Sequence, residues 1–86
     1  MNLWRLLINV VLVLLAVAGV VWQEASIDTS SAMGAAGIAI VASLGAALMG
    51  EFFGIIFGLG DFDKKTYFLS VAIGAVVAVI LSLIVI

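Results

Sequence analysis

A single carboxylate, Glu51, lies within the second of three long apolar stretches of this sequence. It precedes Asp61 by ten residues, roughly 15 Å along a helix, which is mid-membrane if Asp61 lies at the interface. A carboxylate at that depth is costly, so it faces a cavity, a partner or a pore, or stays protonated. Two interpretations follow. Glu51 either binds an ion or a proton, or it reaches a headgroup, a donor of a neighbouring subunit or a water-filled lumen because its helix overshoots the bilayer.

Three other polar side chains could take part in binding. Lys64 and Lys65 form a solvated loop that sets membrane topology, or they line a lumen or touch anionic lipid headgroups. Asn9 is expected to hydrogen-bond between helices or to lie near the interface. The sequence has no histidine and no cysteine, and no catalytic dyad, phosphate-binding loop or metal cluster can be assembled from it. We therefore expect neither an enzyme nor a metal site, and no cofactor beyond bound phospholipid or another membrane lipid.

Small residues recur every four positions in the second half of the chain, which places them on one face of a helix. Burial of apolar side chains contributes little to helix pairing in lipid, whereas close approach across small residues favours it. We expect the two ridges of this glycine zipper to mate with each other; alternatively, one ridge faces another subunit or lines a conducting path. The predicted helix-packing residues are Ala42, Ala46, Gly50, Gly54, Gly58, Ser70, Gly74, Ala78 and Ser82.

The composition predicts the helices on which these residues lie. The chain has 86 residues, of which 67% are hydrophobic, and only three basic and five acidic side chains. That is too little polar material to coat a soluble domain, so we expect one membrane-embedded, all-α unit. Its net charge of −2 excludes a basic nucleic-acid-binding face. The predicted helices span about 3–22, 32–60 and 66–86, the last two forming an antiparallel hairpin, with Gly58 and Gly60 able to end one helix and Asp63 to cap the next.

The few charges predict a topology. Arg5, Lys64 and Lys65 fall on one side of a three-crossing chain, and Glu24 and Asp28 fall on the other. The positive-inside rule then places the N-terminus and the 61–65 turn in the cytoplasm. The first stretch also resembles a secretory signal, with Arg5 as its basic region and the small-residue run 16–18 as a cleavage site. We interpret it as a retained helix.

The hairpin of residues 34–86 resembles the conjugative pilins of type IV secretion systems. The resemblance rests on the Gly/Ala-rich segment 34–60, the Lys-bearing turn 61–65 and the apolar ending 81–86. It implies a self-assembling subunit of a helical filament that carries bound phospholipid, with the Lys turn facing a lumen through which a DNA–protein substrate passes. Many such pilins lose an N-terminal signal, whereas here the first helix is expected to remain.

Two further families compete with the pilins. Residues 45–60 and 68–86 are similar to the small three-helix transglycosylase-associated membrane proteins, although this chain has no proline for their usual first loop. Phage holins are also short, three-helical and self-associating, but often end in a charged tail that this sequence lacks. We expect a self-assembling structural subunit, with copies of itself, membrane lipids and transported DNA, bound without sequence specificity, as partners. The alternatives are an accessory or ion-conducting subunit, with Glu51 as the working residue, or a holin-like pore former.

Overall fold

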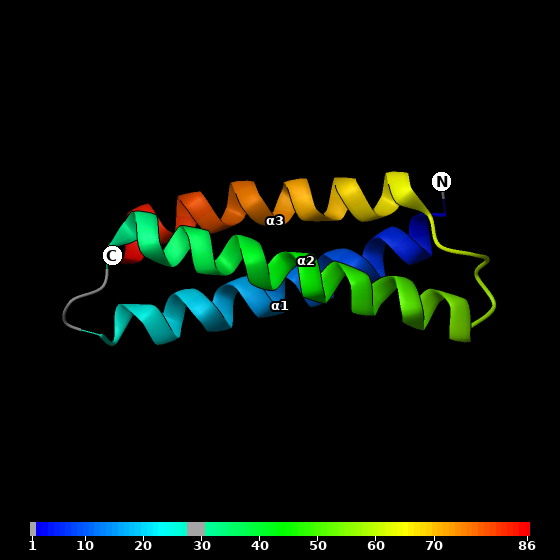
Figure 1. Ribbon diagram of the computed structural model, residues 1–86, viewed down its shortest axis with the longest axis horizontal. Coiled ribbons are helices and arrows are strands. Elements are labelled where there is room, and N and C mark those ends of the chain that lie inside the picture. The colour runs from blue at the N-terminus through cyan, green and yellow to red at the C-terminus, as the bar shows by residue number, and fades with distance from the viewer. Residues whose placement is uncertain (1, 28–30) are drawn as a thin grey trace.

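The computed structural model describes residues 2–27 and 31–86, which form three helices: α1 (Leu3–Ala25), α2 (Ala32–Ile56) and α3 (Lys64–Val85). The helices lie side by side along one elongated bundle, and α2 and α3 run in opposite directions (Figure 1). Each is long and apolar enough to cross a membrane, as expected of an integral membrane protein. The all-α prediction is confirmed. Asp28, which we expected in an acidic loop, lies outside the described residues.

Local capping groups fix where each helix begins. The Asn2 side chain accepts a hydrogen bond from the backbone N–H of Trp4 at 2.9 Å, and Ser31 does the same for Gly34 at 3.1 Å. Asp63 caps α3, as its position after the glycine-containing turn predicted. Capping satisfies backbone donors that would otherwise have no partner at a helix terminus. The polar residues between the apolar stretches therefore act as helix starts.

The second helix ends at Ile56 rather than near Gly60, as the sequence had suggested. Gly58 adopts a left-handed φ of 77°, its N–H donates to the Ile55 carbonyl, and the N–H of Leu59 donates to the carbonyl of Gly54. This pair of bonds is the Schellman motif, which closes a helix where a glycine tolerates a positive φ. Because the chain leaves the helix here, residues 57–63 fold back over the end of the bundle.

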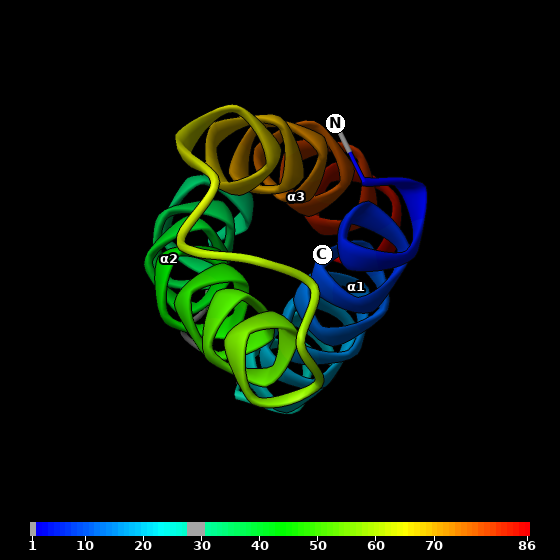
Figure 2. The ribbon, with the colours of Figure 1, turned by 90° about the vertical axis from the view of Figure 1, so that its right-hand side faces the viewer.

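The interior of the bundle is built from side chains spaced four residues apart on every helix. Four residues exceed one helical turn of 3.6, so each stripe winds around its helix and the helices wind about one another to keep the stripes in contact. Figure 2 shows the three helices arranged around the common centre that these stripes fill. The buried residues are Arg5, Asn9, Val13, Val17 and Val21 on α1, Ala35, Ala39, Ser43, Ala47, Gly50, Glu51 and Gly54 on α2, and Thr66, Ser70, Gly74, Ala78 and Ser82 on α3.

The fold buries only some of the residues in the two predicted small-residue ridges. All four ridge residues of α3 face the interior, and so do Gly50 and Gly54 of α2. The other three α2 ridge residues do not: Ala42 and Ala46 are half-buried, and Gly58 is exposed beyond the helix. The expected mating of the two ridges is also wrong for Gly50 and Gly54, because a Cβ atom on either would collide with α1, not with α3. Gly50 and Gly54 therefore leave the space in which α1 packs closely against α2.

Candidate functional site

Glu51 and Arg5 form an ion pair at the end of the bundle that carries the N-terminus. The Arg5 Nε atom lies 3.2 Å from Glu51 Oε1, and the two side chains are 3% and 0% exposed. Glu51 Oε1 also accepts a hydrogen bond of 2.7 Å from the backbone N–H of Asp63, and Oε2 accepts one of 2.6 Å from Asn9 Nδ2. Both carboxylate oxygens are thus bound within the chain, which compensates the loss of water around a buried charge.

Arg5 also binds the backbone of the segment that follows α2. Its Nη1 donates to the carbonyls of Asp61, at 2.6 Å, and Leu59, at 3.4 Å. Its Nη2 donates to the carbonyls of Gly60, at 3.0 Å, and Glu51, at 3.3 Å. Lipid offers no donor to such carbonyls, so irregular backbone near a membrane has to be satisfied by protein. A single guanidinium, with five N–H donors in a fixed fork, provides this for the three consecutive carbonyls of residues 59–61.

Asn9 fits against Gly50, which explains why a glycine precedes the buried carboxylate. A Cβ atom on Gly50 would overlap Asn9 Oδ1 and lie 3.0 Å from the Asn9 Cα atom. Asn9 Oδ1 itself is buried without a conventional hydrogen-bond partner. It occupies the space in which a Cβ atom of residue 50 would lie. Gly50 therefore lets α1 approach closely enough for the Asn9 amide to reach Glu51.

The start of α3 completes the polar end of the bundle. The Asp63 side chain accepts hydrogen bonds from the backbone N–H groups of Lys65 and Thr66 and from the Thr66 hydroxyl, at 3.0, 3.3 and 2.7 Å. Lys64 and Lys65 are exposed on the rim of an open depression over the 59–65 segment. Thus the structure brings Arg5, Asn9 and Glu51 together inside the bundle and leaves the two lysines outside it.

The Asp63 cap makes the start of α3 sensitive to acid. The Thr66 hydroxyl, its N–H and that of Lys65 hold the pKa of Asp63 below its ordinary value of 3.8. Ionised Asp63 therefore stabilises the folded state above that pH, and this contribution is lost as the pH falls through the lowered pKa. We expect Thr66→Val to return the pKa of Asp63 toward 3.8, which makes this contribution smaller: the variant is less stable than the parent chain at neutral pH, and the difference shrinks as the pH falls below 3.8, as measured by thermal unfolding in detergent along a pH series.

Asp61→Asn provides the control for this experiment, because Arg5 contacts the backbone carbonyl of residue 61, which the substitution keeps. The control variant should retain the acid transition of the parent chain. An unchanged transition in Thr66→Val would show that the Asp63–Thr66 bond contributes nothing to the cap.

Sequence reasoning singled out Glu51 but missed its partner. The side chain lies five residues before the end of α2, ~7.5 Å along the axis, directly beneath the 57–63 segment. The donors that it reaches belong to its own chain, not to a headgroup or a neighbouring subunit. Arg5 was interpreted as a topology-setting charge and as the basic region of a possible signal sequence, not as the partner of Glu51. The available signal was the four-residue spacing of Arg5, Asn9 and the buried valines of α1.

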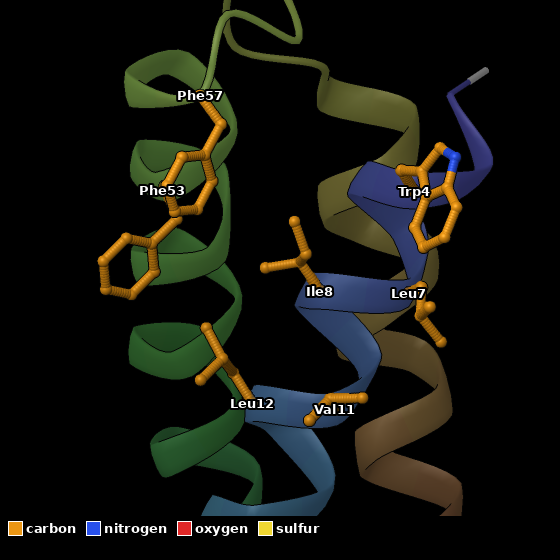
Figure 3. A pocket seen from close by; sticks show the side chains of 7 residues that line it. All are labelled: Trp4, Leu7, Ile8, Val11, Leu12, Phe53 and Phe57. Atoms are coloured by element: carbon orange, nitrogen blue, oxygen red, sulfur yellow. The ribbon is translucent and has the colours of Figure 1, made fainter.

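Outside this network the described surface of the helices is largely apolar. One open groove runs between α1 and α2 close to the polar end, and Figure 3 shows Ile8 and Leu12 between the two ribbons. The groove is lined by Trp4, Leu7, Ile8, Val11, Leu12, Phe53 and Phe57. It offers no polar lining, so it can contact acyl chains or apolar helices but has no group with which to orient a polar ligand.

Comparison with known proteins finds no matching family model, no curated protein similar in sequence and no similar solved structure.

Proposed function

We propose that this chain is a structural, non-enzymatic membrane subunit that acts by packing against other helices, above all against copies of itself. One observation carries the proposal: the buried charged groups, Arg5 and Glu51, are bound to each other and to the backbone, while large apolar side chains cover the outside. A surface of this kind binds lipid or other apolar helices. Three exposed glycines, Gly19, Gly37 and Gly45, have open space where a Cβ would lie and would permit close helix contacts.

A pilin-like protomer of a lipid-containing DNA-transfer filament is the specific form of this proposal. The antiparallel α2–α3 pair supports it: Lys64 and Lys65, expected in the turn, form the exposed first turn of α3, where they can face a lumen or lipid headgroups. In this form α1 is retained, because cleavage near residues 16–18 would remove Arg5 and leave Glu51 without its counter-charge. By the positive-inside rule, we expect the end with Arg5, Lys64 and Lys65 on the cytoplasmic side before assembly.

Glu51 has a structural role in this proposal rather than a role in conduction. An ion-binding carboxylate needs a free oxygen and a path to water, whereas both Glu51 oxygens are bonded and the side chain is 0% exposed. Substitution of Glu51 would therefore disturb the fold before it revealed a transport defect, and it is unsuitable for separating a filament subunit from an ion-conducting one.

The direct test is to shear intact producing cells, image the released fraction by electron microscopy and identify its protein by intact mass. We expect uniform filaments that contain this chain at its full 8.9 kDa, Arg5 included. Cells that lack the coding sequence serve as the control. If the protein stays in the membrane fraction and no filament carries it, the filament form of the proposal fails. Self-association in the membrane would then be measured separately by native electrophoresis of the detergent extract.

A further inference from the structure

The first helix fits a groove that the other two helices form for it. A Cβ atom on Gly54 would lie 2.6 Å from Arg5 Nε, and one on Gly74 would overlap Val13 Cγ1. Together with the Gly50–Asn9 contact, these positions form three depressions that receive successive side chains of the α1 stripe. At the end that holds Glu51, the docked helix must also carry a positive charge, which Arg5 supplies. The α2–α3 groove therefore selects a helix that carries Arg, Asn and Val at four-residue intervals.

The buried ion pair holds the connection between α2 and α3. Arg5 and Glu51 hold the α2–α3 segment through the backbone of residues 59–61 and 63. In the described part of the α1–α2 connection, the backbone N–H groups of Ser26 and Ile27 bond back to Gln23 and Glu24, at the end of α1 itself. The contacts that dock α1 thus come from its helical face, and they do not depend on which chain supplies the helix.

We propose that α1 also docks into the α2–α3 groove of a neighbouring copy, so that exchanged first helices link the subunits. The inference rests on the self-association proposed above. Exchange keeps the contacts that the face of α1 makes inside the groove, and extending the chain after Ala25 gives up the two turn hydrogen bonds of Ser26 and Ile27, so it is a low-cost route to assembly. From Ala25 to Ala32 there are seven Cα–Cα steps, which reach ~23 Å when extended. The Cα atoms of the bundle span 17 and 15 Å across its two short axes, so a connection of this length is longer than the backbone of one bundle is wide.

Paired cysteines in the full-length chain test the exchange, because the native sequence has none. Val13 and Ser43 both contact the position that a Cβ on Gly74 would take, inside the bundle. Two differently tagged copies, one Val13→Cys and one Ser43→Cys, are co-expressed and oxidised in the membrane. We expect a mixed-tag disulfide dimer about tenfold above the background of two Val13→Cys copies, because docking raises the local thiol concentration only for the first pair.

Two controls make every outcome informative. The double variant V13C/S43C should form a disulfide within the chain where α1 keeps its own groove and between chains where α1 is exchanged, and either product confirms that the two positions meet. A second pair of full-length copies, Arg5→Gln and Glu51→Gln, uses no cysteine. If exchange occurs, their co-expression yields more folded protein than either alone, since the first supplies an intact groove and the second an intact α1.

The readouts separate failure of exchange from failure of self-association. Mixed dimers at background level, with no rescue by co-expression, overturn the exchange. If native electrophoresis then still resolves oligomers of the unmodified chain, self-association stands and proceeds through the outer surface. If the unmodified chain is monomeric in the membrane extract, both proposals fail.

Discussion

Replacing Arg5 by leucine is expected to lower the free energy of unfolding by about 3–5 kcal/mol, the range found when one partner of a buried ion pair is removed. Glu51 would remain at 0% exposure without a counter-charge. The carbonyls of residues 59–61 would lose their donor at the same time. Both costs are larger next to lipid than in water, because no solvent replaces the lost partner.

The measurement is reversible unfolding by SDS in mixed micelles, followed by the fluorescence of Trp4 and Trp22 near the two ends of α1. Arg5→Lys keeps the charge but loses the forked donor geometry, so we expect an intermediate loss. Leu7→Ala is the matched control, since this neighbouring α1 side chain is 51% exposed and lies outside the network.

The double variant Arg5→Leu/Glu51→Leu distinguishes a lost charge pair from lost packing. Replacing both members of a buried pair by apolar residues is often close to neutral, so part of the stability should return. An Arg5→Leu variant that unfolds within about 1 kcal/mol of the parent chain would mean that the pair contributes no more than a surface ion pair.

The helices could be predicted because their determinants are local. Long apolar stretches set the three elements, and the glycines at 58 and 60 and the Asp63 cap set the turn between the last two. The end of α2 was misplaced by four residues because a continuous apolar run through Leu59 hides the Schellman motif. Of the two glycines that the sequence offered as helix ends, Gly58, with its left-handed φ, is the one that closes the Schellman motif.

The buried face of α2 was harder to predict, for a physical reason. This helix is so rich in glycine and alanine that several faces are smooth, and spacing alone favoured Ala42 and Ala46 over the buried Ser43 and Ala47. What selects the face is the partner: Arg5 and Asn9 must reach Glu51, which fixes the rotation of α2. The Arg5–Glu51 pairing joins residues 46 positions apart, and no local pattern in α2 encodes it.

Gly74→Ala is expected to destabilise the bundle by about 1–3 kcal/mol, the usual cost of overpacking a tightly packed core. The added methyl would overlap Val13 Cγ1 and approach Ser43 Oγ to 2.6 Å, so α1 and α2 would both have to move. Gly45→Ala is the control: nothing lies within 4 Å of its Cβ position, and alanine favours helix by up to about 1 kcal/mol.

If Gly74→Ala lowers and Gly45→Ala raises the free energy of unfolding in the same SDS assay, Gly74 lies in the packed interior of the bundle and Gly45 on its outer surface. Val13→Ala supplies a further test, because it removes the γ-methyl that the new Cβ would strike. The double variant Val13→Ala/Gly74→Ala should therefore be more stable than the sum of the two single losses predicts. Strict additivity would show that Val13 and Gly74 do not meet. In that case α1 does not lie in the α2–α3 groove, and the Arg5–Glu51 pair would lose its structural basis as well.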